Sequence, residues 1–202
     1  MQSIRKKCVL SIVLGWSTFT LYANAFFTEN PKNSIATVLQ KQASPNFAPP
    51  FDRNEFEDFK EALAFKESQG DYQVVNKLGY LGKYQFGSTT LERFDILDTT
   101  AFLTNPALQE KAFVALCKVN KWILRNDIKR SVGKKIKGIV ITESGILAAA
   151  HLAGAGNVKK FLRSNGTQTF SDAFGTTVEI YLEMFAAYDT SSIQPNRMPG
   201  LV

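Results

Sequence analysis

Apolar residues recur at three- and four-residue steps through most of the chain between Asp52 and about residue 190, and this spacing constrains the fold more than any other feature. Alternation typical of strands is scarce, and "YQVVN" (72–76) is the best short candidate. The expected helices run from a capping box of Asp52 and Glu55 to about Ser68, from Asn105-Pro106, from about Thr142 to Leu152, and over 158–163 and 177–188. We therefore predict a mainly α fold.

Two of these helices have features that predict where they lie. The helix that begins at Asn105 has Pro106 at its first position, and its expected apolar face comprises Leu108, Ala112, Leu116, Val119 and Ile123. The helix from Thr142 is rich in alanine and apolar throughout ("GILAAAHLAG"), as a central buried helix would be.

The N-terminus predicts export. Residues 1–25 combine a basic head, the mostly apolar run "CVLSIVLGWSTFTLY" and an Ala-x-Ala site at Ala23–Ala25, which together are typical of a cleavable signal peptide. An uncleaved membrane anchor is the alternative, but no second apolar stretch follows. We expect residues 26–51 to form an irregular, proline-bearing N-terminal arm and residues 191–202 an irregular C-terminal tail. The predicted location is periplasmic or secreted, with no integral membrane segment once the signal is removed.

Charge and cysteine usage exclude several classes of protein. Signal removal takes away three basic residues and no acidic one, so the formal net charge falls from +6 to +3 and nucleic acid is not an expected partner. "KRSVGKKIKG" (129–138) is a local basic cluster, which we interpret as a solvated loop between helices. Cys117 then remains alone in an apolar helical pattern and is expected to be a buried thiol. With one histidine in the chain, no metal site and no cofactor are expected.

Glu67 is the candidate catalytic residue. Phe56, Phe59 and Leu63 mark the apolar stripe of the first helix, and Glu67 occupies the next step along it. A carboxyl group partly removed from water there would have a raised pKa, as a general acid at neutral pH requires. The alternative is a glutamate at a frayed helix end, or one paired with Lys66 or Lys83.

Two gapped motifs resemble those of one family. Glu67-Ser68, Tyr72, Gly79, Gly82 and Gln85 are similar to the E-S-x-x-[WY]…G-x-x-G-L-M-Q signature of lytic transglycosylases and goose-type lysozymes. "AAAHLAGAGNVKKFL" (148–162) resembles the A-A-Y-N-A-G-P-G-x-V-x-x-[WF]-L block of the same family. Around Tyr181 there is a weaker similarity to that family. The resemblance covers about Phe56 to Leu162.

The resemblance implies a fold, a reaction and a set of site residues. Residues 52–190 would form a lysozyme-like helical catalytic domain, with a small irregular or β-like loop region after the catalytic helix. Glu67 would act as the single acid and base that cleaves the β-1,4 bond between N-acetylmuramic acid and N-acetylglucosamine in peptidoglycan glycan strands, giving 1,6-anhydro products. An envelope or secretion machine is a further candidate partner. The residues that would contact the glycan are Ser68, Tyr72, Gly82, Tyr84, Gln85, His151, Gly154 and Tyr181.

The chain departs from the family pattern at several positions. "GKYQF" (82–86) stands in place of G-L-M-Q-I, a form that is also similar to resuscitation-promoting-factor-like domains, and His151-Leu152 replaces Tyr-Asn. Tyr80 and Tyr84 could stack on sugar rings or pack in the wall of the site. No second acid is compelling, and Asp71 is expected to be a solvated loop residue. A hydrolytic muramidase and a non-catalytic glycan-binding protein therefore remain alternatives to the transglycosylase.

Overall fold

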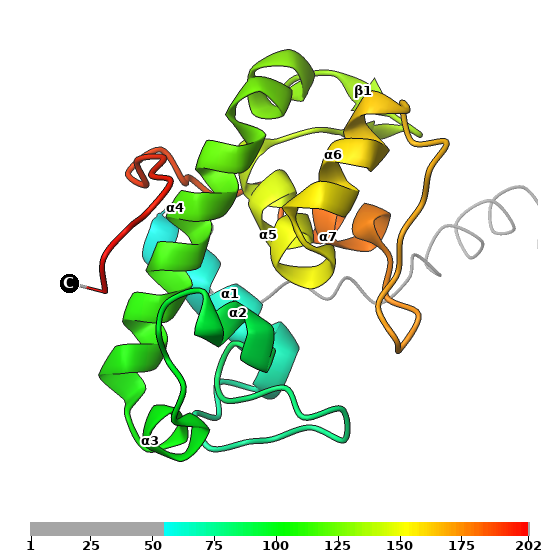
Figure 1. Cartoon of the computed structure of the whole chain (residues 1–202). Helices are drawn as coiled ribbons and strands as arrows, with labels where there is room; N and C mark the ends of the chain where they lie inside the picture. Colours follow the sequence, from blue (N-terminus) through cyan, green and yellow to red (C-terminus); the bar gives the residue numbers. More distant parts are fainter. Residues whose placement is uncertain (1–54, 202) are drawn as a thin grey trace, which may run out of the picture. The chain divides into compact units, whose positions relative to one another are not determined.

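The computed structural model describes residues 55–201, so the predicted signal peptide, the N-terminal arm and Asp52 lie outside the described residues. Over this range the chain forms seven helices and one small antiparallel hairpin, which confirms the prediction of a mainly helical domain (Figure 1). In chain order the elements are α1 (Phe56–Ser68), α2 (Ser88–Glu92), α3 (Thr99–Leu103), α4 (Pro106–Ser131), β1 (Lys135–Ile136), β2 (Ile139–Val140), α5 (Glu143–Ala153), α6 (Ala155–Arg163) and α7 (Val178–Met184).

Helix α1 ends where the sequence predicts and begins at Phe56. Its N-cap residue is Glu55, whose side chain makes no capping hydrogen bond, so the predicted capping box does not define this end of the helix. The helix ends at Ser68 because Gln69 adopts a left-handed backbone conformation with φ of 60°. The side chains of Phe59 and Leu63 are fully buried, which fixes the direction of the apolar stripe.

Helix α4 begins as predicted, with the Asn105 side chain accepting a hydrogen bond from the Leu108 N–H and Pro106 at the first position. Its predicted apolar face is correct only in part. Ala112 and Val119 are buried, but Leu108, Leu116 and Ile123 are only half-buried at its edge. The buried positions instead include four polar or aromatic residues that no apolar pattern reveals, namely Gln109, Phe113, Asn120 and Asp127.

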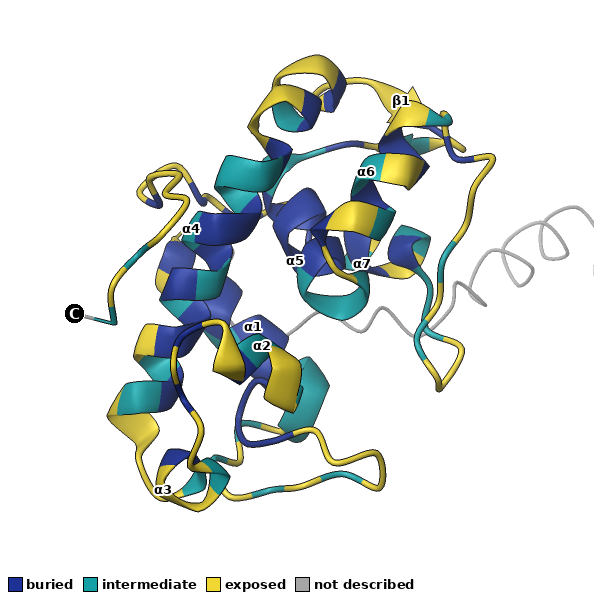
Figure 2. Cartoon of the chain, in the orientation of Figure 1, coloured by how far each residue is buried: buried dark blue, intermediate teal, exposed yellow. Residues whose placement is uncertain are grey.

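Helix α5 is the predicted central buried helix, and every residue from Ser144 to Ala150 is buried (Figure 2). It packs against α4, α6 and α7. The contact with α7 depends on Gly145, because a Cβ atom there would lie 2.5 Å from the Leu182 carbonyl oxygen. Cys117 of α4 is also buried, as predicted, and burial raises the pKa of its thiol to about 12.

The hairpin β1–β2 lies within the basic stretch 129–138 and just beyond it, where the sequence analysis expected a loop. Lys137 and Gly138 both have positive φ values, 51° and 86°, which suits the two-residue turn of an antiparallel hairpin. By contrast, the strand candidate at 72–76 forms no strand. Only Val75 makes an isolated bridge to Leu81, so the region after α1 is irregular with slight β character, as predicted.

Helices α6 and α7 lie in the predicted regions of the chain, but their lengths differ from the prediction. Helix α6 begins three residues earlier than expected, and α7 ends at Met184 instead of continuing to Tyr188. From residue 185 to residue 201 the chain forms neither helix nor strand, although Tyr188 and Ile193 are buried. None of the described helices is long and apolar enough to cross a membrane.

Candidate active site

Glu67 lies in the last turn of α1 and lines a cleft of about 330 Å³. Because Leu63 and Phe59 are buried one and two turns earlier, the same stripe carries the Glu67 side chain to the edge of the core. The cleft is bounded by the loop after α1, the end of α5 and the loop before α7. Besides Glu67 its lining residues are Asn76, Leu78, Tyr80, Gln85, His151, Leu152, Ala153, Asn157, Ser171, Asp172, Ala173 and Phe174.

One oxygen of Glu67 is held by a buried phenol. The Tyr181 hydroxyl of α7 donates a hydrogen bond of 2.6 Å to Glu67 Oε1, and the Tyr181 side chain is buried. Burial, followed by the neighbouring Glu67 carboxylate, raises the pKa of Tyr181, so the phenol keeps its proton and remains a donor. Glu67 Oε2 is therefore the oxygen available for proton transfer to a ligand.

Lys83 is not the partner of Glu67, in contrast to one alternative that the sequence leaves open. Its Nζ atom binds Glu61 Oε1 at 2.5 Å and Glu110 Oε1 at 2.8 Å. The Glu67 carboxyl group therefore faces the cleft with Tyr181 as its hydrogen-bonding partner and without an ion pair among the described residues.

His151 also lines the cleft, as the resemblance implies. Its Nε2 atom lies 2.8 Å from the Tyr84 carbonyl oxygen, and because a carbonyl oxygen only accepts, Nε2 carries the hydrogen. Nδ1 is buried and has no partner among the described residues, and the ring packs edge-on against Phe86. His151 thus connects the end of α5 to the loop 82–86.

Gln85 lines the cleft, and its backbone has a left-handed conformation. Gln85 has a φ of 50°, and its side-chain amide donates a hydrogen bond of 3.0 Å to the Gly82 carbonyl oxygen. Tyr80, which the sequence offered as a stacking residue, is 43% exposed at the cleft. These two side chains form part of the cleft wall that follows α1.

Several residues that the resemblance assigns to glycan binding lie outside the cleft and support the fold instead. Ser68 Oγ donates to the Lys83 carbonyl oxygen at 2.7 Å, which ties the end of α1 to the loop. The Tyr72 hydroxyl donates to Glu110 Oε1 at 2.8 Å. Gly154 joins α5 to α6 with a φ of 79° and does not line the cleft.

Tyr84 and Gly82 are likewise structural. The Tyr84 side chain is fully buried and stacks on Phe113 with ring centroids 4.1 Å apart, so its ring cannot present a face to a sugar. Gly82 has a φ of 70°, and a Cβ atom there would lie 2.2 Å from Gln109 Oε1. The Gln109 side chain accepts a hydrogen bond from the Lys83 N–H and therefore requires this close approach.

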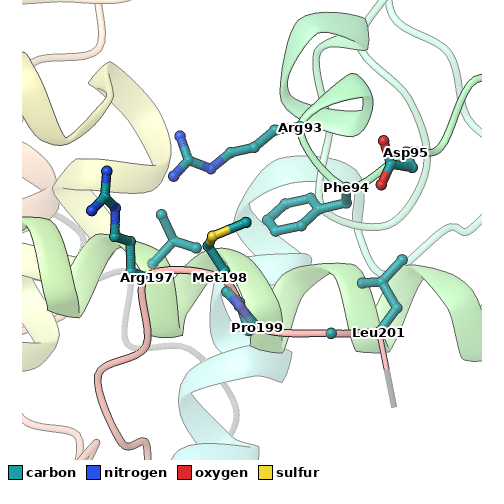
Figure 3. A pocket seen from close by; sticks show the side chains of 9 residues that line it. Arg93, Phe94, Asp95, Arg197, Met198, Pro199 and Leu201 are labelled. Atoms are coloured by element: carbon teal, nitrogen blue, oxygen red, sulfur yellow. The ribbon is translucent and has the colours of Figure 1, made fainter.

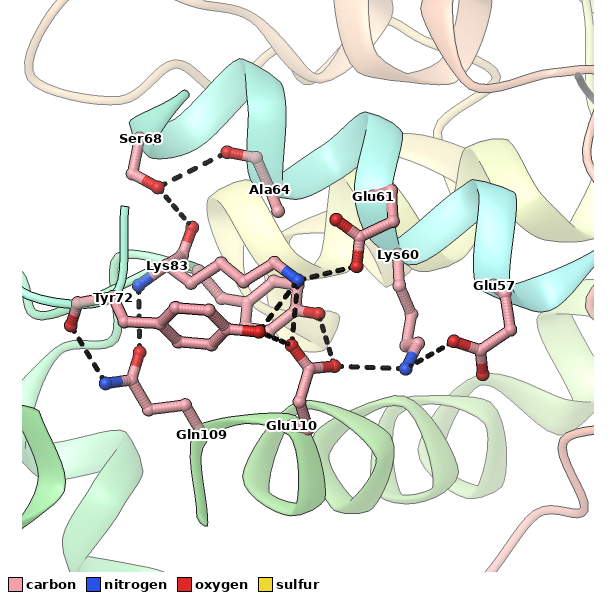
Figure 4. A network of polar contacts seen from close by, with 10 residues as sticks. Glu57, Lys60, Glu61, Ala64, Ser68, Tyr72, Lys83, Gln109 and Glu110 are labelled. Atoms are coloured by element: carbon pink, nitrogen blue, oxygen red, sulfur yellow. Dashed lines mark hydrogen bonds and ion pairs between the residues drawn. The ribbon is translucent and has the colours of Figure 1, made fainter. Parts of the chain in front are cut away.

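Behind the cleft wall, Glu110 of α4 organises a partly buried polar cluster that we call the Glu110 network (Figure 4). Its carboxylate accepts hydrogen bonds of 2.8 to 3.0 Å from Lys60, Tyr72, Lys83 and Tyr84. Burial opposes the charge on Glu110, but these hydrogen bonds outweigh it and lower its pKa to about 2. Burial also opposes the charge on Lys83, yet its hydrogen bonds to Glu110, Glu61 and Tyr72 raise its pKa.

The loop before α7 is the part of the cleft that sequence reasoning missed. Ser171, Asp172 and Phe174 all line the cleft. Asp172 Oδ1 accepts hydrogen bonds from the backbone N–H groups of Phe174 at 2.9 Å and Thr176 at 2.7 Å, so the carboxylate has a fixed orientation. The sequence "SDAFGTT" (171–177) contains the aspartate and glycine of such a turn, but it does not indicate that the turn faces Glu67.

Asp71, the acid that the sequence analysis singled out, lies elsewhere. It is exposed, it does not line the cleft, and its Oδ1 atom accepts a hydrogen bond of 2.7 Å from the Gln73 N–H. The prediction that Asp71 is a solvated loop residue is therefore confirmed. The second carboxylate in the cleft is that of Asp172.

The cleft lining suits a ligand that is both polar and partly apolar. Asn76, Asn157 and Gln85 offer amide donors and acceptors. Leu78 and Phe174 are 52% and 67% exposed, which leaves apolar surface at the cleft. Within residues 55–201 no group of His, Cys, Asp and Glu side chains could hold a metal ion.

Comparison with known proteins returns nothing for this chain, because no family model, no curated protein and no solved structure matches it.

Proposed function

We propose that this chain is an exported peptidoglycan lytic transglycosylase in which Glu67 is the acid and base. The observation that carries the proposal is the Glu67 carboxyl group in an open cleft, with one oxygen held by the Tyr181 hydroxyl at 2.6 Å and the other available to a ligand. A carboxyl group with a fixed orientation and an available oxygen is what proton transfer to a glycosidic oxygen requires. The resemblance of the two sequence motifs to those of lytic transglycosylases supports the same residue, since Glu67 matches the catalytic glutamate of that family's motif.

In the proposed reaction Glu67 acts twice. Its Oε2 proton passes to the glycosidic oxygen as the bond from that oxygen to C1 of the N-acetylmuramic acid breaks, which leaves an oxocarbenium-like sugar and a Glu67 carboxylate. The carboxylate then takes the proton of the 6-hydroxyl group of the same sugar while that oxygen bonds to C1. The product is a 1,6-anhydro ring, and Glu67 is protonated again for the next turnover.

The remainder of the cleft supports a glycan as the ligand. N-acetylated sugars present hydroxyl and acetamido groups, which the Asn76, Asn157 and Gln85 amides can bind. Pyranose rings also have apolar faces, and the exposed Tyr80 and Phe174 rings offer matching surfaces.

A hydrolytic muramidase is the second candidate, and Asp172 is the observation that favours it. Hydrolysis needs a water in place of the 6-hydroxyl group, together with a group that orients this water. The Asp172 carboxylate lines the same cleft as Glu67, and two backbone N–H groups fix one of its oxygens. Its other oxygen has no hydrogen-bonding partner among the described residues and could bind a water.

The test is digestion of purified peptidoglycan by residues 26–202, with the released muropeptides analysed by mass spectrometry. We expect anhydro-muropeptides from the wild type and a loss of at least about 100-fold in Glu67→Gln, since general acid catalysis contributes about that much or more. Glu57→Gln is the matched control, because this carboxylate lies on the same helix but is 71% exposed and outside the cleft.

Each other outcome has a distinct meaning. Reducing-end products that disappear in Asp172→Asn, with Glu67 still required, would replace the transglycosylase by the muramidase. Wall binding without released fragments from folded wild-type protein would leave only the non-catalytic binding protein. Full activity of Glu67→Gln would refute both enzymatic proposals.

A further inference from the structure

A second cavity, of about 440 Å³, shares no residue with the Glu67 cleft (Figure 3). It is formed by the turn after α2, by α4 and by the C-terminal segment 197–201. The segment is held in place, since the Asn196 N–H donates to the Lys118 carbonyl oxygen at 3.1 Å and the Met198 N–H donates to Asn196 Oδ1 at 2.9 Å. The cavity wall is therefore a built part of the domain.

Two arginines and one aspartate line this cavity. Figure 3 shows the Arg93 and Arg197 guanidinium groups at one end, with the Asp95 carboxylate at the other, beyond the Phe94 ring. Among the described residues neither arginine forms an ion pair. Guanidinium groups without an ion-pair partner at one end of a cavity attract an anion, and a planar carboxylate matches their geometry best.

Next to the arginines the cavity is apolar. Phe94 and Val119 are buried in its floor, and Met198, which is 84% exposed, stands at its rim. An exposed methionine beside buried apolar side chains adapts readily to the shape of an apolar group. The cavity thus places a carboxylate-binding end directly beside an apolar floor.

We propose that this cavity binds the C-terminal residue of a partner peptide that has a free carboxylate and an apolar side chain. The two guanidinium groups bind the carboxylate, and the side chain lies between Phe94 and Met198. A peptide C-terminus combines these two groups on one carbon atom, whereas inorganic phosphate has no apolar part. The proposal does not depend on the activity proposed for Glu67, since the two sites have no residue in common.

Trp122 makes the proposal testable by fluorescence. The chain has two tryptophans, and Trp16 lies in the predicted signal peptide, so Trp122 is the sole tryptophan of residues 26–202. The Arg197 guanidinium lies 5.3 Å from the centre of the Trp122 ring, and movement of this arginine onto a ligand would change the emission. The probe is N-acetyl-alanyl-leucine, and its C-terminal amide is the matched comparison.

We expect a saturable change in emission with the free acid and at least tenfold weaker binding of the amide. Arg93→Gln should weaken binding of the acid at least tenfold while Glu67-dependent glycan cleavage is unchanged, and Lys134→Gln, an exposed cation outside the cavity, should bind as the wild type does. Equal binding of acid and amide, or wild-type binding by Arg93→Gln, would refute the proposal. A response to inorganic phosphate as strong as that to the peptide would reduce the cavity to a simple anion site and also overturn it.

Discussion

Replacing Glu110 by glutamine should destabilise the domain strongly even though Glu110 does not line the cleft. The carboxylate accepts hydrogen bonds from Lys60, Tyr72, Lys83 and Tyr84, and the Lys83 side chain is 5% exposed. In Glu110→Gln the negative charge is lost. The glutamine N–H₂ group is itself a donor, so it cannot accept the hydrogen bonds that one carboxylate oxygen accepts in the wild type. Lys83 would then retain only Glu61 as an anionic partner, and the side chain of Glu61 is 40% exposed.

The expected loss is about 3 kcal/mol in the free energy of unfolding, at the low end of the roughly 3–5 kcal/mol for removing one partner of a buried ion pair. It is at the low end because the Glu110 side chain is 25% exposed and Glu61 compensates in part. For a chain of this size that corresponds to a fall in the melting temperature of about 6–12 °C. Tyr84 and Lys83 carry the loop that His151 contacts, so we also expect lower activity at temperatures where the variant is still folded.

The pH dependence of stability gives a second, independent measure. The folded pKa of Glu110, about 2, is below its ordinary value of 4.5, so its stabilising effect is complete above that ordinary value and is lost as the pH falls toward 2. Between pH 6 and pH 3 this one group should account for about 2 kcal/mol of the wild-type loss in stability. Glu110→Gln cannot titrate at this position, and its stability should fall less steeply with acid.

The assay is urea denaturation followed by circular dichroism at several pH values, with Glu57→Gln as the control. Glu57 also pairs with Lys60, at 2.8 Å, but it is 71% exposed, and its loss should cost no more than about 0.5 kcal/mol. If Glu110→Gln lowers the free energy of unfolding by less than about 1 kcal/mol, or leaves its dependence on pH unchanged, the Glu110 network does not stabilise the loop.

Two further predictions concern the loop and the catalytic carboxyl group. Gly82→Ala should lower the free energy of unfolding by about 2 kcal/mol or more, because the new Cβ would meet Gln109 and the left-handed conformation is strained. Gly79 has a similar φ but open space around it, so Gly79→Ala should lower the free energy of unfolding by only about 1 kcal/mol. Equal losses in the two variants would show that the contact with Gln109 is not the cause. Tyr181→Phe should lower kcat for glycan cleavage about tenfold or more with KM nearly unchanged, because it frees Glu67 Oε1. An increase in KM alone would instead assign Tyr181 to substrate binding.

The position of Glu67 could be predicted from the sequence because a helical stripe is a local signal. Phe59 and Leu63 fix which side of α1 is buried, and the carboxyl group at the next step must then lie at the edge of the core. The starts of α4 and α5 were predictable for the same reason, since Asn105, Pro106 and Thr142 are residue types that favour helix N-termini.

The opposite wall of the cleft could not be predicted in this way. Asp172 and Phe174 reach the cleft because α6 and α7 pack on α5, and no local pattern encodes that approach. The sequence left the role of Tyr84 open for a related reason. A tyrosine in a glycine-rich loop can have an exposed ring or a buried ring whose hydroxyl forms a hydrogen bond. The Tyr84 ring is buried, and its hydrogen-bonding partner Glu110 lies on a distant helix that no local pattern connects with the loop.

The Glu110 network accounts together for Lys83 and Tyr84, two positions at which the chain differs from the transglycosylase motif that it resembles. Lys83 and Tyr84 stand where the motif has leucine and methionine, and each would be costly to bury alone, the one as an unpaired charge and the other as an unpaired hydroxyl. Both bind the carboxylate of Glu110, so a single residue of α4 satisfies the two changes at once. Polar contacts therefore hold the loop beside His151 and Glu67 in place of the apolar packing that leucine and methionine would provide. Changing Lys83, Tyr84 and Glu110 together should lower the free energy of unfolding by less than the sum of the three separate changes.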